Sequence, residues 1–369
     1  MKKKRVMSLL LAAVILLQLC ACGQSADQKT AETHTVQDQV GNTVSVPNTP
    51  QRVVILSTVP LASVYTMMTG EADTIVGMTP ASKNAAQHSF LQKLRDFSQV
   101  ESGFAQGDGI NLEAVAALEP DVLFYNTANA MDAQAAAQLT EMGYPCIGFD
   151  TNISKTGDTV ETFAAWAELM GQILGKETRA KELADYGNAV KERIRQAVSD
   201  VDTPKRVLIL NNYTGTTLLA AGNTFGTFWL SSCGAENVAA EISKPASPVD
   251  LEQIYRWDPE MILLNSFSAY TPEDILQSKA GEGQDWSGLA AVRAGQVFKF
   301  PLGVYYWFAP CSDSPLALLW VAKTVYPERF SEVDLEAEIR QYYRQYYGME
   351  LTQRDLDTLF NPPREAAMG

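Results

Sequence analysis

A string of residues that occurs twice constrains this fold more than any other feature of the chain. The first copy, Asn111–Thr127, reads NLEAVAALEPDVLFYNT, and the second, Asp250–Ser266, reads DLEQIYRWDPEMILLNS. Each copy opens on a helix N-cap residue, continues with Leu-Glu and hydrophobic positions at helical spacing, and gives acid-Pro-acid before four apolar residues. Because proline stops a helix and a short apolar run suits a buried strand, the pattern predicts a short helix that leads into a buried strand. This helix–strand unit occurs twice in the chain.

A second string recurs in the same order along the chain. Pro50–Leu56 reads PQRVVIL, and Pro204–Leu210 reads PKRVLIL. Two independent strings repeated in one order indicate that a whole lobe is duplicated. Strands that alternate with helices favour parallel sheets covered on both faces.

The region between the two copies is predicted to be helical. Apolar residues recur at helical spacing through 156–202, with a break at Gly175 and a second helix at about 177–200. The predicted fold class is therefore α/β, with two lobes of mainly parallel sheets flanked by helices and joined by a single long rigid α-helix. We expect the lobes at 35–155 and 203–369.

Shorter patterns predict the remaining elements. We expect strands within a hairpin at 36–46 and at 74–77, 145–149 and 297–300, a loop at 78–84, and helices at 90–97, 131–142, 224–233, 315–325, 334–347 and 353–359.

The N-terminus has the features of an export signal. Residues Met1–Arg5 are basic, Val6–Leu19 is mostly apolar and too short to span a bilayer comfortably, and Leu19-Cys20-Ala21-Cys22 resembles a bacterial lipobox. We expect 1–22 to be removed or modified as a signal peptide, Cys22 to be lipidated, and 23–34 to be a flexible tether. A plain secretory signal is the alternative.

Composition excludes several classes of function. The chain has 29 Lys+Arg against 43 Asp+Glu, a net charge of −14, which argues against nucleic acid as a partner. It has two histidines, and its cysteines after the signal, Cys146, Cys233 and Cys311, lack metal-ligand spacing. We expect no disulfide, no metal site, no cofactor and no catalytic residues.

In open parallel sheets ligands bind beyond the carboxyl ends of the strands, where this chain places polar and aromatic residues. Four consecutive aromatics cannot all enter one core, because alternate side chains of an extended segment face opposite ways. At least some of them should lie at the surface of the cleft and contact a ligand. The alternative is that two of them are core and two are ordinary loop residues. The predicted ligand-binding residues are Ser57, Thr58, Asn126, Asn211, Tyr213, Asn265, Phe267, Tyr270, Tyr305, Tyr306, Trp307 and Phe308.

Glu113 and Glu252 occupy the same position in the two copies of the repeated string. A carboxylate in the first turn of a helix is favoured by the helix dipole without any function. Their equivalence also makes them a symmetric pair of acids suited to a symmetric basic partner.

Several short stretches together resemble the substrate-binding lipoproteins of ABC importers for iron-siderophores, haem and cobalamin. The stretches are Thr35-Val36-Gln37-Asp38, Pro50–Val54, Ile75-Val76-Gly77, Asn111–Asp121, Leu318–Pro327 and Tyr342-Tyr343. The resemblance implies an exported monomer, lipid-anchored to the outer face of the cell membrane. It also implies that a metal chelate (ferric siderophore, corrinoid or haem) is bound between the lobes, and that Glu113 and Glu252 dock on a permease dimer with its ATPases.

The residues leave the ligand open. The loops at the strand ends contain no arginine, so a corrinoid or a weakly charged siderophore fits them better than a strongly anionic chelate. Oxyanions such as molybdate or tungstate are carried by some members of this family and stay an alternative. A chelatase-like enzyme and a tethered adhesion or sensor protein are the rival functions, which ligand-dependent stimulation of a permease's ATPase would separate from transport.

Overall fold

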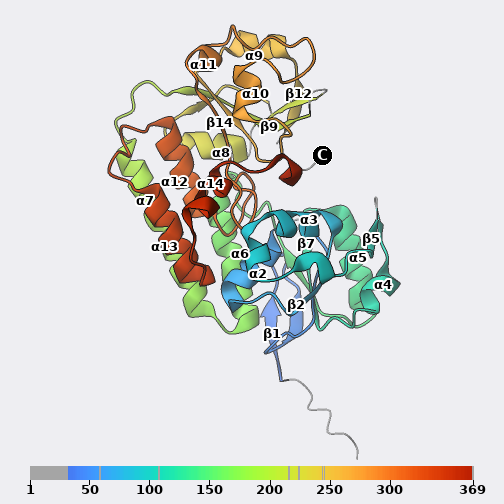
Figure 1. Cartoon of the computed structure of the whole chain (residues 1–369). Coiled ribbons are helices and arrows are strands. Elements are labelled where there is room, and N and C mark those ends of the chain that lie inside the picture. The colour runs from blue at the N-terminus through green and yellow to red at the C-terminus, as the bar shows by residue number, and fades with distance from the viewer. Residues whose placement is uncertain are drawn as a thin grey trace, which may run out of the picture. The chain divides into compact units, whose positions relative to one another are not determined.

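The computed structural model describes residues 32–57, 60–106, 109–214, 217–222, 225–242, 244 and 246–367. Residues His34–Gly369 form one compact unit. Within this unit two α/β lobes are linked by long helices that run along one side (Figure 1). The predicted fold class is confirmed.

A four-stranded parallel sheet forms the core of the N-terminal lobe. Its strands lie in the order β4 (Ile75–Met78), β3 (Val53–Ile55), β7 (Val122–Asn126) and β8 (Cys146–Phe149), and each neighbouring pair is parallel. Alternate residues of β3 enter two different hydrophobic clusters. The sheet is therefore covered on both faces, as the apolar runs predict.

Short helices and a hairpin surround this sheet. They are β1 (Thr33–Gln37), β2 (Thr43–Pro47), α2 (Leu61–Thr69), α3 (Pro80–His88), the 3-10 turns η1 (Phe90–Lys93) and η2 (Phe97–Gln99), the antiparallel pair β5 (Ala105–Gln106) and β6 (Gly109–Ile110), α4 (Leu112–Ala116) and α5 (Ala130–Glu141).

Two predictions in this lobe are wrong. The predicted loop at 78–84 is the start of α3, which begins because the Thr79 side chain accepts a hydrogen bond from Ser82 N and proline occupies the first turn. The predicted helix at 90–97 is the pair η1 and η2, because Ser89 and Asp96 each cap a turn of their own.

Two long helices lie between the two sheets in the chain, and the second of them is the predicted connecting helix. Helix α6 (Thr159–Leu174) ends at Gly175, which has a φ of 62°, and α7 (Glu177–Ala197) follows as 21 continuous residues, about 32 Å at 1.5 Å per residue. Asp158 caps α6 and forms an ion pair with Lys191 of α7, which fixes the two helices to each other. The exact lobe boundaries stay a prediction.

The C-terminal lobe contains a mixed six-stranded sheet. Five of its strands lie in the order β12 (Ser247–Val249), β10 (Leu218–Ala220), β9 (Arg206–Tyr213), β13 (Met261–Leu264) and β14 (Val297–Lys299). The last three are parallel, and β10 is antiparallel to both its neighbours. The sixth strand, β11 (Glu236–Asn237), pairs with the start of β9. The sequence did not predict β10 or β12; unlike the equally short β3 and β14, neither lies in a recognised apolar run.

Helices cover this sheet and extend back toward the first lobe. They are α8 (Phe225–Ser231), α9 (Leu251–Trp257), α10 (Pro272–Leu276), α11 (Ala290–Arg293), α12 (Ser314–Val325), α13 (Leu335–Tyr347), α14 (Gln353–Phe360) and the 3-10 turn η3 (Arg364–Ala366). The predicted helices at 315–325, 334–347 and 353–359 are confirmed as α12, α13 and α14.

The duplicated strings form equivalent structures in the two lobes. The backbone amide of Arg52 donates to the Asp121 carboxylate at 3.1 Å, and that of Arg206 donates to the Glu260 carboxylate at 2.9 Å. These bonds tie the first strand of each lobe to the end of the repeated string. Glu119 and Asp258, the residues before the two prolines, also share positive φ angles of 46° and 38°. A left-handed residue is uncommon outside glycine, so its recurrence supports the duplication.

Candidate functional site

The carboxyl ends of the parallel strands lie near the contact between the lobes. The Phe90 amide of the first lobe donates to the Gly303 carbonyl of the second at 2.9 Å. The Phe90 ring also meets the edge of Tyr343 with centroids 5.7 Å apart. The loop after β14 therefore contacts the N-terminal lobe directly.

Four buried side-chain oxygens near these strand ends have no hydrogen-bond partner among the described residues. Ser57 Oγ and Asp132 Oδ2 belong to the N-terminal lobe, and Asn212 Oδ1 and Ser268 Oγ belong to the C-terminal lobe. Buried polar atoms in proteins are nearly always hydrogen-bonded, so each unsatisfied atom needs a physical reason. A ligand received between the strand ends is such a reason.

In the N-terminal lobe, two predicted ligand residues follow neighbouring strands. Ser57 comes two residues after β3 and is buried, and Asn126 ends β7. The Asn126 side-chain oxygen accepts hydrogen bonds from Ala128 N at 3.0 Å and from Thr151 Oγ1 at 3.2 Å. Thr58, also predicted, lies outside the described residues.

Asp132, in the first turn of α5, is a site candidate that the sequence did not reveal. Its side chain is buried, and this burial raises the pKa of the carboxyl to about 6, although a hydrogen bond from the Asn126 backbone lowers it. An acid in a first turn is ordinarily an exposed residue favoured by the helix dipole. Only its burial beside the end of β7 distinguishes it, and the sequence carries no signal of that burial.

In the C-terminal lobe, the predicted asparagines are brought together. Asn265 Nδ2 donates to Asn211 Oδ1 at 3.0 Å, and Asn265 Oδ1 accepts from the amide of Phe267 at 3.3 Å. Asn265 is fully buried. The pair links the ends of β9 and β13 and leaves the neighbouring Ser268 hydroxyl without a partner.

Lys299, the last residue of β14, is the second candidate that the sequence did not reveal. Its side chain is only 6% exposed, and its amine donates to the Ser268 carbonyl at 2.9 Å. Burial, followed by the charge of Arg364, lowers the pKa of the amine to about 8, while Asp274 raises it. At neutral pH this buried amine carries a positive charge.

Two predicted tyrosines belong to a different environment. Tyr213 is fully buried in the second core cluster, where its hydroxyl donates to the Ala280 carbonyl at 2.7 Å. Burial raises its pKa to about 12. Its ring lies 4.6 Å from that of Tyr270, which is partly exposed.

The four consecutive aromatics are all buried, so the expectation that some of them lie at the surface is wrong. The segment is not extended: Gly303 N donates to Tyr305 O, and Trp307 N donates to Pro301 O. This folded loop turns adjacent side chains inward. As a result Tyr305, Tyr306, Trp307 and Phe308 all join the main core.

Specific contacts hold these rings in place. Trp307 Nε1 donates to Asp313 at 2.9 Å, and the Tyr306 hydroxyl donates to the Ala366 carbonyl. The Phe267 ring, also predicted to bind ligand, packs against Tyr306 with centroids 4.6 Å apart. Their role as ligand contacts stays a prediction.

The two docking candidates are exposed in matching positions. Glu113 lies in the first turn of α4, where Asn111 caps the helix by accepting from Ala114 N at 3.1 Å. Glu252 lies in the first turn of α9, its side chain is 87% exposed, and Asp250 caps the helix in the same way. Cys22 lies outside the described residues.

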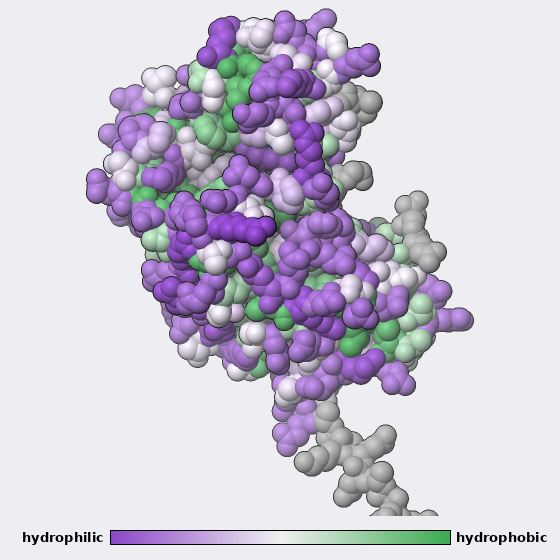
Figure 2. Space-filling model, viewed as in Figure 1, coloured by the Kyte–Doolittle hydropathy of each residue, from purple (hydrophilic) through white to green (hydrophobic). Residues whose placement is uncertain are grey.

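The surface offers little apolar area for docking. Figure 2 shows a face that is hydrophilic over most of its extent. Among the described residues, the exposed large hydrophobic side chains are Val40, Met142 and Tyr255. No helix in this part of the chain is long and apolar enough to cross a membrane. The described residues also hold no cluster of three His, Cys, Asp or Glu side chains suited to a metal ion.

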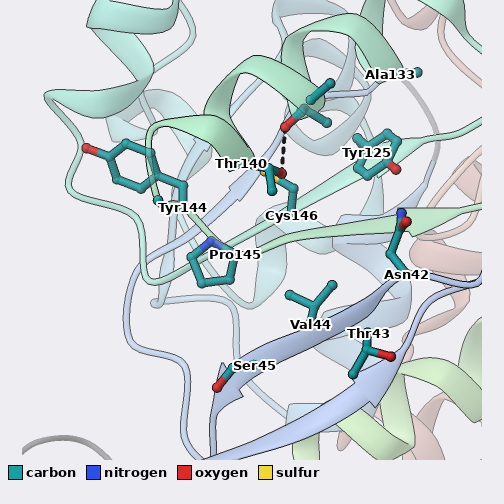
Figure 3. Close-up of a pocket in the computed structure, with 13 residues that line it drawn as sticks. Asn42, Thr43, Val44, Ser45, Tyr125, Ala133, Thr140, Tyr144, Pro145 and Cys146 are labelled. Atoms are coloured by element: carbon teal, nitrogen blue, oxygen red, sulfur yellow. Dashed lines mark hydrogen bonds between the residues drawn. The ribbon is translucent and has the colours of Figure 1, made fainter.

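Two pockets border the sheets of the two lobes, one in each lobe. One of about 640 Å³ separates β2 from α5 and β8, with Thr43, Val44 and Ser45 on one side and Pro145 and Cys146 on the other (Figure 3). The other, of about 550 Å³, borders β14. It is lined by Thr271, Pro272, Glu273, Val297, Phe298, Lys299, Trp320, Phe360, Asn361, Pro362, Pro363 and Arg364.

Comparison with known proteins gives consistent matches. Residues 53–302 match the family described as periplasmic binding protein. A crystal structure of a periplasmic solute binding protein from Veillonella parvula is 30% identical, with a TM-score of 0.81 over 89% of this chain and 97% of that chain.

Two characterised relatives are more distant. The molybdate-binding protein MolA of Haemophilus influenzae is 26% identical over 85% of this chain and 90% of its own length. Its molybdate-bound structure has a TM-score of 0.72 over 86% of this chain and 99% of that chain. A vitamin B12-binding protein of Yersinia pseudotuberculosis is 23% identical over 66% of this chain and 89% of its own length.

Proposed function

Since the chain belongs to the periplasmic binding protein family, a family of extracytoplasmic solute-binding proteins, we propose that it is the substrate-binding protein of an ABC importer. We propose further that its solute is a small oxyanion of the molybdate class, held between the strand ends of the two lobes. The protein delivers this solute to its permease and is not an enzyme.

The observation that carries the proposal is a pair of buried, unsatisfied hydroxyls at the strand ends, one in each lobe. Ser57 and Ser268 each present a buried hydroxyl that has no acceptor. An oxyanion offers several acceptor oxygens in a small volume, which suits isolated donors on two facing lobes. The similarity to the molybdate-binding protein supports the same class of solute.

A metal chelate, such as a ferric siderophore, a corrinoid or haem, is the second candidate. The vitamin B12-binding relative supports it. A corrinoid or haem ring offers a wide face for aromatic contacts, and the aromatics predicted to supply them, Tyr305 to Phe308, are buried in the core. The geometry therefore favours the smaller solute.

Delivery requires docking and a location near the membrane. We assign docking to Glu113 and Glu252, which are exposed and lie in the first turns of equivalent helices, so that both can meet basic residues of a permease dimer. We assign lipid anchoring to Cys22, which would hold the protein on the outer face of the cell membrane as a monomer.

Two measurements test the proposal. Native mass spectrometry and an absorption spectrum of protein isolated without added ligand show whether a coloured chelate co-purifies. Fluorescence titration with molybdate, tungstate, cobalamin, cobinamide, haem and siderophores then ranks the solutes. We expect saturable binding of molybdate and tungstate. Tight binding of cobalamin or haem, with no response to oxyanions, would show that the solute is a metal chelate and not an oxyanion.

A further inference from the structure

The amine of Lys299 is buried at the end of β14 without a counter-charge in contact. It takes part in none of the ion pairs that the described residues form. We propose that Lys299 and Ser268 form an anion subsite that receives the negative charge of the solute in the C-terminal lobe. This inference rests on the proposed function and specifies the charge that the site selects.

A protonated amine in the interior needs compensation. Burying a charge without a partner carries a large free-energy cost, and such groups are normally paired. The hydrogen-bond partner of Lys299 is one backbone carbonyl, that of Ser268. The nearby acid, Asp274, is already engaged by the Arg364 guanidinium at 2.8 Å and 2.9 Å and by the Thr271 hydroxyl at 2.9 Å.

The Ser268 hydroxyl adds a second donor, on the residue whose carbonyl accepts from Lys299. Its side chain is fully buried and its oxygen has no hydrogen-bond partner. Lys299 pairs in register with Leu264, and Ser268 follows four residues later in the loop after that strand. The ammonium group has one carbonyl acceptor and no ion-pair partner, and the hydroxyl has no acceptor. Together they suit an anionic group with oxygen acceptors.

There is room for such a group beside Lys299. The pocket of about 550 Å³ that borders β14 includes Lys299, Arg364 and Thr271 in its lining. Arg364 also lines the pocket, but its charge is paired with Asp274, and the one acid in the lining, Glu273, is exposed. Lys299 therefore supplies the unpaired charge. The shared chemistry is an oxygen-rich anion, supplied either by an inorganic oxyanion or by the carboxylates of an anionic chelate.

The test compares two site variants with a matched control. Lys299→Met keeps the aliphatic stem and removes the charge, and Ser268→Ala removes the hydroxyl. Lys323→Met is the control, because Lys323 also donates to a single backbone carbonyl, that of Phe330 at 2.8 Å, but lies in α12 away from the strand ends. Affinities for molybdate and for iron(III) citrate are measured by calorimetry, and melting temperatures are measured without ligand.

We expect Lys299→Met to weaken binding of the preferred probe on the order of 100-fold and Ser268→Ala about tenfold, with no effect of Lys323→Met. The melting temperature of Lys299→Met should equal or exceed that of the natural protein, because an uncompensated charge has been removed. Unchanged affinity in Lys299→Met, or a fall in its melting temperature without added anion, overturns the proposal.

The function and the subsite can fail separately. If the natural protein binds iron(III) citrate but not molybdate, the oxyanion function fails and the subsite is retained. If it binds neither, a thermal-shift series with sulfate, phosphate, citrate and tungstate decides the matter. An anion that stabilises the natural protein and not Lys299→Met supports the subsite, and the absence of any such anion excludes it.

Discussion

At the scale of single residues, Lys299 and Asp132 share an unusual situation although their charges are opposite. Lys299 is buried at the end of β14 and Asp132 in the first turn of α5, and neither forms an ion pair with a described residue. Residues that lower stability in this way are often kept for function. Replacing them should therefore stabilise the free protein.

For Lys299, burial lowers the pKa from 10.5 to about 8. The amine takes up its proton below pH 10.5 in the unfolded chain but only below about pH 8 in the folded protein. The folding stability linked to this difference is therefore present above pH 10.5 and is lost as the pH falls through 8. Lys299→Met should therefore exceed the natural protein in unfolding free energy at pH 7, by at most about 3 kcal/mol. Urea denaturation at pH 7, 8.5 and 9.5 checks this: the difference should shrink as the pH rises, and a constant difference would contradict the burial of a charged amine.

For Asp132, burial raises the pKa from 3.8 to about 6. The linked stability is present below pH 3.8 and lost as the pH rises through about 6. Asp132→Asn should unfold with a free energy up to about 3 kcal/mol higher than the natural protein at pH 7. The gain should disappear near pH 4, and the exposed Asp185→Asn serves as the control; a gain that persists at pH 4 would exclude burial of the charge as its cause.

The sequence could predict only part of the site. Asn126, Asn211 and Asn265 follow buried apolar runs, so their places at strand ends are readable from the pattern. Lys299 and Asp132 look like ordinary charged residues, because burial arises from elements far away in the chain. An extended loop would turn some of the four aromatics at 305–308 toward the surface, whereas the backbone hydrogen bonds of this loop fold it and bury all four.

At the scale of elements, the repeated string accounts for most of the correct predictions. The strands β7 and β13 and the helices α4 and α9 follow from it, because N-caps, proline and apolar runs are local signals. Helix α3 has the sequence PASKNAAQH, which contains no large apolar residue, and β10 is a short strand that pairs antiparallel with β9 and β12. These elements depend on their neighbours, so the sequence alone did not reveal them.

The equivalence of α4 and α9 leads to a prediction about docking. Reversing both charges with Glu113→Lys and Glu252→Lys should abolish solute uptake and leave solute affinity unchanged, because both side chains are exposed. Uptake in cells and calorimetry on the purified protein measure the two effects. Glu336→Lys, in the first turn of α13, is the control for helix-dipole effects; normal uptake in the double variant would refute the docking role.

At the scale of the whole compact unit, the C-terminal segment joins both lobes. Asp355 of α14 pairs with Lys93 of the N-terminal lobe at 2.7 Å, and Arg364 of η3 pairs with Asp274 of the C-terminal lobe at 2.8 Å. Residues 353–367 lie outside the family match at 53–302. This segment restrains separation of the lobes in addition to α7.

Removing both pairs should loosen the contact between the lobes. In the double variant Lys93→Met and Arg364→Met, hydrogen exchange at the Phe90 amide, which bonds to Gly303, should accelerate several-fold, since partly exposed ion pairs contribute about 0.2–1 kcal/mol each. The cations are replaced because Asp355 and Asp274 also cap their helices. Arg195→Met, which breaks a pair within α7, should leave this exchange rate unchanged. Equal exchange rates in all three proteins would show that the segment does not hold the lobes.

The central claim is that a small oxyanion binds between the strand ends of the two lobes. A crystal structure of the protein grown with molybdate, with anomalous scattering recorded at the molybdenum edge, tests it most directly. We predict one strong anomalous peak within hydrogen-bonding reach of the strand-end groups, with Ser268 and Lys299 among its contacts. A peak in the pocket between β2 and α5, or no peak at saturating molybdate, would contradict the claim.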